Sequence, residues 1–323
     1  MSSRRMARIW PYTRFTVYQR ELRKAAARWF SKKGYVTDTK MRYCLKSRND
    51  WSLNIICKDV AEYIQRENEQ SMGEKFFPLH KYLHHGLSSQ ALIFNLVGPL
   101  IVRKDLEPLR IAIERAGIDW PEGEITTEFE YDNKTIFNED SGQPTSMDLV
   151  ISGENGRIFV ESKFTEQEFG DCSVFTGGDC DGRNPLVYGL DTCYLHHIGR
   201  KYWVLMSEFG FGDSGIASGF ICPFTNYYQF FREVLFSLKE EGCFLLLYDE
   251  RSPVFVKTSK NGIESGLWPF LLESVPNQHK RKIGRVTIQQ VVQAISESGR
   301  HSDWLGEFKQ KYGIDTHIQT KLK

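Results

Sequence analysis

Residues 145–164, TSMDLVISGENGRIFVESKF, decide the fold because they predict two neighbouring strands joined by a tight turn. Apolar and polar residues alternate in the runs 145–152 and 156–164, and a period of two is typical of a β-strand. Between the runs lies Asn155-Gly156, a dipeptide that favours a two-residue hairpin turn. The stretch therefore predicts a β-hairpin.

The hairpin also predicts that three charged side chains lie together. Asp148 falls on one face of the first run, and Glu161 and Lys163 share a face of the second. A two-residue turn at the dipeptide sets Asp148 opposite Lys163, whereas a four-residue loop at 153–156 sets it opposite Glu161. A shift of one residue would bury all three charges among apolar side chains, at a prohibitive cost. Both registers therefore place the three charges on one side of the sheet.

Such a cluster contains the groups that hydrolysis of a phosphodiester requires. The two carboxylates are hard oxygen ligands, which suit Mg²⁺ or Mn²⁺. The lysine can orient or deprotonate the attacking water, or stabilise charge on a phosphoryl oxygen. Metal ions assist both the nucleophile and the leaving oxygen in this reaction. We therefore interpret Asp148, Glu161 and Lys163 as the catalytic residues of a nuclease.

The spacing of these residues resembles the signature of the PD-(D/E)xK nuclease superfamily, which has the restriction-endonuclease-like fold. Asp148 is followed, after twelve residues, by Glu161-Ser162-Lys163. Met147 stands where the signature has a proline. In this resemblance Asp148 and Glu161 match the metal ligands, the backbone carbonyl of Ser162 matches a third ligand, and Lys163 matches the catalytic lysine.

The resemblance covers about residues 80–250 and implies an α/β (α+β) fold, with a mixed central β-sheet flanked by helices. It further implies Mg²⁺-dependent (or Mn²⁺-dependent) cleavage of DNA. The helix that begins at Ser88-Ser89-Gln90, with Asn95, also resembles that of a bacterial group of predicted restriction endonucleases.

The rest of the chain predicts three regions: a basic helical N-terminal region (1–79), the nuclease-like core (80–250), and a C-terminal helical extension packed on the core (251–323). Helices are predicted over 14–33 and 57–69, from Ser88 or Ser89 to Gly98-Pro99, from Asp105 to near Gly117, over 185–200, 226–241 and 287–299, and near Asp303. Further strands are predicted over 124–131, 201–209 and 243–249.

Three residues are candidates for accessory roles in the site. Gln90 could hydrogen-bond a water or phosphate near the metal, and a structural position on the helix surface is an equal alternative. Glu128 and Glu130 share a face of the strand 124–131, and either could add a metal ligand. Exposed charges on an edge strand are the favoured interpretation for both glutamates.

The cysteines suggest no metal site by their spacing. Cys172, Cys180 and Cys193 lie near His196 and His197, but no C-x-x-C pair is present and the gaps do not fit the usual zinc or iron–sulfur ligand patterns. The seven cysteines of the chain are an odd number and widely scattered. We interpret them as ordinary reduced thiols.

The charge is unevenly distributed along the chain. The net charge is +1, but residues 1–50 contain 14 Lys and Arg against three acids, so the remainder carries an excess of acidic residues. This balance indicates a polyanion partner for the N-terminal region. The nucleic-acid-binding candidates lie on the polar face of the helix 14–33, as phosphate-backbone contacts: Arg20, Arg23, Lys24 and Arg28.

Hydrophobic residues make up 41% of the chain and charged residues 26%, which excludes global disorder. The sequence shows no membrane span or signal peptide, so we expect a cytoplasmic protein with no membrane partner. The function that these patterns favour is that of a Mg²⁺-dependent nuclease acting on DNA, of the restriction-endonuclease type. Cutting both strands usually requires two active sites, which a homodimer would supply. The alternatives are a non-catalytic nucleic-acid-binding or assembly protein on the same fold, and a nuclease that prefers RNA or branched DNA.

Overall fold

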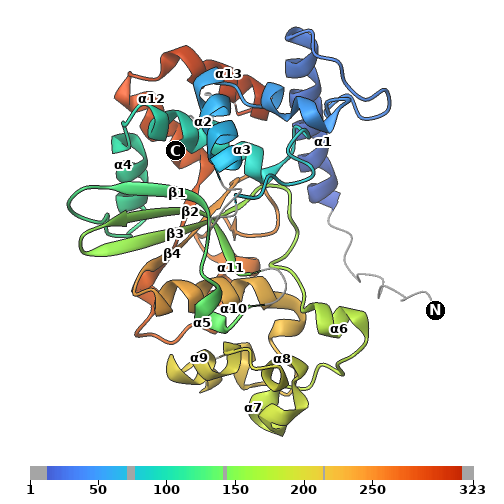
Figure 1. Cartoon of the computed structure of the whole chain (residues 1–323), viewed down its shortest axis with the longest axis vertical. Coiled ribbons are helices and arrows are strands. Elements are labelled where there is room, and N and C mark those ends of the chain that lie inside the picture. Colours follow the sequence, from blue (N-terminus) through green and yellow to red (C-terminus); the bar gives the residue numbers. More distant parts are fainter. Residues whose placement is uncertain (1–12, 71–76, 141–143, 214, 315–323) are drawn as a thin grey trace.

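The computed structural model describes residues 13–70, 77–140, 144–213 and 215–314. Its centre is a mixed five-stranded sheet in the order β1-β2-β3-β4-β7, with helices on both sides (Figure 1). The strands are β1 (Thr126–Asp132), β2 (Ser146–Gly153), β3 (Gly156–Lys163), β4 (Cys243–Tyr248) and β7 (Ile283–Thr287). β1, β2 and β3 are antiparallel neighbours, whereas β3, β4 and β7 run parallel. The predicted α/β fold with a mixed sheet is confirmed.

Two sets of helices cover the sheet (Figure 1). One side carries α1 (Thr13–Lys32), α2 (Lys58–Gln70), α3 (Ser89–Val102), α4 (Glu107–Arg115), α12 (Ile288–Ser298) and α13 (Ser302–Tyr312). The other side carries α5 (Lys134–Phe137), α10 (Phe224–Lys239) and α11 (Leu267–Leu272). Further from the sheet, short helices form a lobe: α6 (Ser173–Gly177), α7 (Pro185–Tyr188), α8 (Tyr194–His197) and α9 (Tyr202–Glu208).

Short elements complete the architecture. The 3-10 turns are η1 (Arg48–Asn54), η2 (Leu190–Thr192), η3 (Phe211–Asp213), η4 (Gly215–Ser218) and η5 (Lys280–Lys282), and a small hairpin pairs β5 (Lys257–Thr258) with β6 (Glu264–Ser265). One hydrophobic core runs from Leu22 of α1 to Phe308 of α13. None of the described helices is both long and apolar enough to cross a membrane.

The β2–β3 hairpin forms in one of the two predicted registers. Ser152 pairs with Arg157 and Gly153 with Gly156, so the two turn residues are Glu154 and Asn155 rather than the Asn155-Gly156 dipeptide. The reason is a contact with the preceding chain, because Glu154 N–H donates to the Glu122 carbonyl (2.8 Å) and the Asn155 Oδ1 accepts from Glu122 N–H (2.8 Å). Leu149 pairs with Val160 in this register, so the next pair along the strands is Asp148 opposite Glu161.

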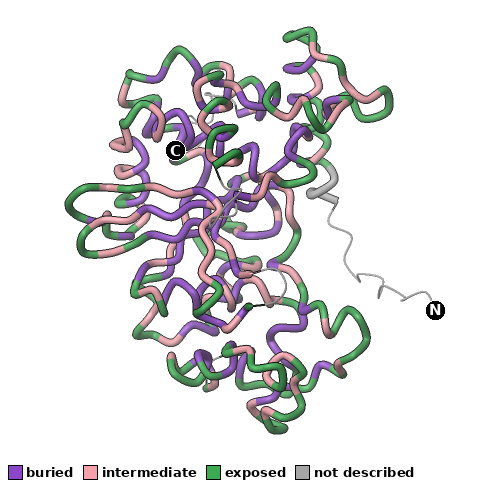
Figure 2. The backbone as a smooth tube through the Cα atoms, viewed as in Figure 1, coloured by how far each residue is buried: buried purple, intermediate pink, exposed green. Residues whose placement is uncertain are grey.

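Both faces of the β2–β3 hairpin are largely buried (Figure 2). The face that carries the charged residues is therefore covered by other elements and does not face solvent. Phe159 shares the face of Glu161 and is fully buried against Phe236 of α10, with the ring centroids 5.6 Å apart. The opposite face contacts α3, where Phe129 packs edge-on against Phe94. The charged residues therefore occupy a polar pocket within a covered face.

Helix α3 departs from its predicted end. It begins as predicted, because the Ser88 Oγ accepts a hydrogen bond from Ala91 N–H (3.2 Å). It then continues through Gly98 and Pro99 rather than stopping there. A Cβ at residue 98 would lie 2.6 Å from the Val60 Cγ1, so this glycine permits close packing against α2. Tertiary packing thus outweighs the local stop signal.

Three other predicted elements need correction. Residues 201–209 form the helix α9 and not a strand, because the buried residues Tyr202, Trp203, Leu205 and Met206 follow helical spacing. The predicted helix 185–200 is broken into α7, η2 and α8 around Gly189, which has a φ of 106°. Strand β7 lies within the predicted helical extension 251–323, so the central sheet extends beyond residue 250.

Candidate active site

The three charged residues of the hairpin meet in one pocket. Asp148 on β2 and Glu161 on β3 fall in the same register line of the sheet. The Asp148 Oδ2 accepts a hydrogen bond from Ser162 N–H (2.7 Å), and the Lys163 Nζ donates to the Glu161 Oε1 (2.6 Å). The side chains of Glu161 and Lys163 are only 6% and 5% exposed, whereas Asp148 is half-buried. Solvent therefore reaches the pocket at its Asp148 end.

Helix α10 adds two residues that the sequence interpretation missed. The Gln229 amide bridges the pair, because its Nε2 donates to the Glu161 Oε1 (2.8 Å) and its Oε1 accepts from the Lys163 Nζ (2.7 Å). Glu233, one turn further on, is buried, and within the described chain its Oε2 has no hydrogen-bond partner. The available signal was a pair of polar residues four apart, each next to an aromatic or aliphatic residue of the helix.

Of the accessory candidates, Glu130 and Gln90 lie beside the site. The Gln90 Nε2 donates to the Glu130 Oε1 (2.7 Å) and to the Pro78 carbonyl (2.8 Å). Glu130 is half-buried, not an exposed edge charge, and its φ of 55° is unusual for a residue that is not glycine. Glu128 pairs with Val150 of β2, and its charge contributes to the raised pKa of Tyr63 on α2.

The pocket holds more negative charge than its lysine neutralises. Burial and the charges of Glu161 and Glu130 raise the pKa of Asp148 well above its usual range. Burial, then Glu161, raises the pKa of Glu130 to about 7, although the Gln90 hydrogen bond opposes this rise. The pKa of Glu233 is raised too, again by burial and then by Glu161. Four carboxylates facing one ammonium group must either retain protons or acquire a cation.

Lys163 remains protonated despite its burial. Burial disfavours its charge, but the carboxylates of Glu161 and Glu233 hold its pKa above the ordinary value. Its ammonium group is therefore a permanent hydrogen-bond donor near neutral pH. Among the described residues, no group of three or more His, Cys, Asp or Glu side chains is placed so that it could hold a metal ion. A metal here would rest on two carboxylates and a backbone carbonyl.

We expect the pH dependence of stability to reveal the crowded carboxylates. Between the ordinary pKa of 4.5 and about 7, folded Glu130 keeps a proton that the unfolded chain has lost. The proton on Glu130 therefore stabilises the folded state. This contribution to the free energy of unfolding is complete below pH 4.5 and is lost as the pH rises through about 7. For Glu130 alone this amounts to roughly 3 kcal/mol. Urea unfolding at about pH 5 and about pH 8, without divalent ions, measures it. The Glu130→Gln variant should show a smaller difference, and an equal difference in both proteins would contradict the assignment.

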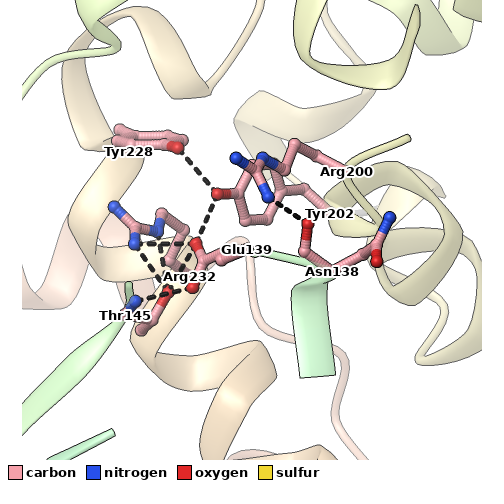
Figure 3. A network of polar contacts seen from close by, with 7 residues as sticks. All are labelled: Asn138, Glu139, Thr145, Arg200, Tyr202, Tyr228 and Arg232. Atoms are coloured by element: carbon pink, nitrogen blue, oxygen red, sulfur yellow. Dashed lines mark hydrogen bonds and ion pairs between the residues drawn. The ribbon is translucent and has the colours of Figure 1, made fainter. Parts of the chain in front are cut away.

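A second polar network holds the segment that leads into β2 (Figure 3). The buried Glu139 accepts hydrogen bonds from Thr145 N–H (2.6 Å), the Tyr202 hydroxyl (2.5 Å) and the Arg232 guanidinium (2.9 Å). The guanidinium also donates to the Thr145 Oγ1, and the Tyr228 hydroxyl donates to that of Tyr202 (2.9 Å). Thr145, which precedes β2 and lies three residues before Asp148, is thereby tied to α9 and α10.

Helix α1 lies next to the end of β3, which it contacts through its buried Tyr18. The Tyr18 hydroxyl donates to the Phe164 carbonyl (2.8 Å), one residue beyond Lys163. The basic candidates on this helix are all exposed: Arg20, Arg23, Lys24 and Arg28. Two of them pair with Glu21, the Arg20 Nε at 3.5 Å and the Lys24 Nζ at 3.1 Å, and such exposed pairs are weak and exchangeable.

A mixed sheet with acidic residues on adjacent strands and a lysine beside them defines a protein of the restriction-endonuclease-like class. Comparison with family models agrees, since the model described as "Restriction Endonuclease associating with ARP" (REase-ARP) matches residues 23–313. The chain belongs to this family, and is thus a nuclease-type protein. No curated protein and no solved structure matches it.

Proposed function

We propose that this protein is a Mg²⁺-dependent endonuclease of the restriction type, which hydrolyses phosphodiester bonds of DNA. The observation that carries the proposal is the shared pocket of Asp148, Glu161 and Lys163 on the β2–β3 hairpin, in a chain of the REase-ARP family. Carboxylates and a fixed ammonium group are what in-line attack on a phosphodiester needs. Cleavage of both strands would follow if two copies acted together.

The residues present suit a divalent cation. Asp148, Glu161 and the backbone carbonyl of Ser162 would hold Mg²⁺ or Mn²⁺, both of which prefer oxygen ligands. The raised pKa of Asp148 and the unpartnered Oε2 of Glu233 support this assignment, because both indicate negative charge that the protein alone does not neutralise. When bound, the cation would supply Lewis-acid polarisation of the phosphoryl group and a lowered pKa for the attacking water.

Lys163 would act as a donor and not as a base. The Glu161 carboxylate and the Gln229 amide fix its ammonium group in place, and its raised pKa keeps the proton. Such a group stabilises the charge that develops on a nonbridging phosphoryl oxygen. Gln229 would be a positioning residue, since its hydrogen bonds run to Glu161 and Lys163.

The exposed basic face of α1 supports DNA as the substrate. Arg20, Arg23, Lys24 and Arg28 would contact backbone phosphates, which adds affinity without sequence preference. Phosphate contacts alone do not separate duplex DNA from RNA or branched DNA. A panel of these substrates, cut in parallel, distinguishes the proposal from its alternatives.

Lys163→Met is expected to lower Mg²⁺-dependent nicking of supercoiled plasmid about 10²–10³-fold, because it removes a preorganised charge from the transition state. Rates are measured on agarose gels with Mg²⁺, with Mn²⁺ and with a chelator. Lys239→Met, which removes an exposed ammonium group of the same helix that carries Gln229, is the matched control and should cut normally.

If the wild-type protein cuts none of the nucleic acids in the panel with either metal, the nuclease proposal is wrong. Binding of the same nucleic acids without cleavage would then favour the non-catalytic alternative. Cleavage that is equal with a chelator and with Mg²⁺ would reject the metal.

A further inference from the structure

The lobe of short helices carries many large apolar side chains on its surface. More than half of the large apolar residues that are exposed in the described chain lie between Phe175 and Ile221. Phe220 and Ile221 are the most exposed of them, at 73% and 68%. Single exposed apolar residues are ordinary on a protein surface, whereas a dense group of them indicates an interaction site.

Six of these residues form one surface, which we call the apolar patch: Phe175, Val187, Tyr188, Tyr194, Phe220 and Ile221. The rings of Tyr188 and Phe220 lie 6.4 Å apart, and Ile221 forms an isolated β-bridge with Arg183. The Arg183 guanidinium in turn lies over the Tyr188 ring, 5.6 Å from its centroid. The segments 183–188 and 220–221 are therefore neighbours.

The remaining aromatic residues of the apolar patch adjoin the same segments. A Cβ at residue 182 would lie 2.9 Å from the Phe175 ring, so Phe175 packs against Gly182, the residue before Arg183. Tyr194 lines the same small cavity as Phe175 and Arg183. The fold thus gathers apolar residues from four separate parts of the lobe.

One buried side chain fixes the geometry of the apolar patch. Asn184 is fully buried, and its Nδ2 donates to the carbonyls of Ala217 and Gly219 (both 2.7 Å), which holds the loop just before Phe220. Its Oδ1 accepts from Leu186 N–H (3.1 Å) and caps α7, which carries two residues of the patch. Side chains on an ordered backbone lose less entropy when they bind, so the patch is preorganised for a partner.

The area of the apolar patch matches one side of a stable protein interface. On the scale of about 150–250 Å² for a whole aromatic side chain, the exposed fractions of its six residues amount to roughly 700 Å². The largest apolar patch of a typical monomer covers about 300–600 Å², whereas each partner contributes about 800 Å² to a standard interface. The area therefore favours a protein partner.

The charge of the apolar patch favours a second copy of the chain over nucleic acid. Its six residues are uncharged, and Arg183 beside them is already paired with Asp181 (2.6 Å), so the patch does not supply the free cations that bind backbone phosphates. A two-fold contact sets the same surface on both sides, which would make a charged patch repel its own copy. An uncharged apolar patch is complementary to itself.

We infer that the apolar patch is a two-fold interface with a second copy of this chain, anchored by Phe220 and Ile221. Figure 1 shows the lobe and α1 at opposite ends of the molecule, so a dimer formed through the lobe leaves the exposed basic residues of α1 free to bind nucleic acid. Such a dimer also brings two pockets into one particle, as the proposed cutting of both DNA strands requires. The interface itself does not depend on that function.

The test is the mass of the full chain in solution, measured by sedimentation equilibrium without nucleic acid or divalent ions. Wild-type protein is expected to form a dimer at micromolar concentration. Phe220→Asp and Ile221→Asp each place a charge in the interface and should raise the dissociation constant at least about 30-fold, as loss of an anchor residue does. Ile263→Asp, in the turn between β5 and β6, is the matched control, because Ile263 is equally exposed (67%) but lies outside the lobe. It should dimerise like the wild type.

The substituted residues are exposed, so the variants should fold normally, which far-UV circular dichroism checks. Wild-type protein that stays monomeric at high micromolar concentration would overturn the inference. So would a dimer that both patch variants retain, because it would use another surface. Weaker binding of duplex DNA by Phe220→Asp, with an unchanged mass, would assign the patch to nucleic acid instead. Because the mass is measured without nucleic acid or metal, it leaves the proposed nuclease activity to be judged by its own assay.

Discussion

Asp148→Asn is expected to lower Mg²⁺-dependent DNA cleavage by at least about 10³-fold, equivalent to about 4 kcal/mol of transition-state stabilisation. The substitution keeps the shape of the side chain and an oxygen that can accept from Ser162 N–H, so the hairpin should fold normally. It removes only the negative charge that we propose holds the cation. Initial rates of plasmid nicking, compared with those of wild-type protein, give the effect.

The same variant should be more stable than the wild type when no divalent ion is present. Burial and two neighbouring glutamates hold the pKa of Asp148 above its usual range, so an uncharged amide relieves repulsion near pH 8. Saturating Mg²⁺ should raise the free energy of unfolding of the wild type and leave that of Asp148→Asn nearly unchanged. Asp119→Asn, at an exposed position, is the control and should alter neither activity nor stability. Full metal-dependent activity of Asp148→Asn would contradict the assigned role.

Arg232→Met is expected to destabilise the protein by about 3–5 kcal/mol, because it leaves the Glu139 carboxylate buried without a countercharge. The side chains of Glu139 and Arg232 are 2% and 16% exposed, and their atoms meet at 2.9 Å. The loss also frees the Thr145 Oγ1 from its bond to the guanidinium (Figure 3). Urea-induced unfolding, followed by far-UV circular dichroism, measures the change in free energy.

Two comparisons isolate the buried charge as the cause. Lys239→Met removes a cation from an exposed pair with Glu208, in which both side chains are 43% exposed, and should cost less than about 1 kcal/mol. The double variant Arg232→Met/Glu139→Gln should recover part of the lost stability, since a neutral amide is less costly to bury than a carboxylate. If the double variant were no more stable than Arg232→Met, the electrostatic explanation would be wrong.

Much of the site followed from local rules that act within the hairpin. Alternation with a period of two placed Asp148, Glu161 and Lys163 on one face in either register, and the structure brings the three together. The starts of two helices were equally predictable from the sequence. Both α3 and α12 begin where they were predicted, α3 after the cap of Ser88 and α12 after a capping box of Thr287 and Gln290. These features depend on residues within about twenty positions of each other, so neighbouring sequence is sufficient to specify them.

Features that depend on distant packing were missed or misread. Gln229 and Glu233 lie some 70 residues beyond β3 and reach the pocket only because α10 crosses that face of the sheet. The aromatic run of α9 is compatible with a strand or a helix until its partners are known. The Gly98-Pro99 dipeptide predicts the end of a helix, but α3 continues through it, and Gly98 packs closely against Val60.

The sequence alone therefore determined the hairpin, its catalytic-type triad of charges and the class of fold, since strand periodicity and the cost of burying charge leave few other arrangements. Only the tertiary structure decided which other groups join them, namely the carboxylates of Glu130 and Glu233 that crowd the pocket. Long-range contacts of this kind depend on how helices and strands pack, and no short-range pattern in the chain encodes that packing.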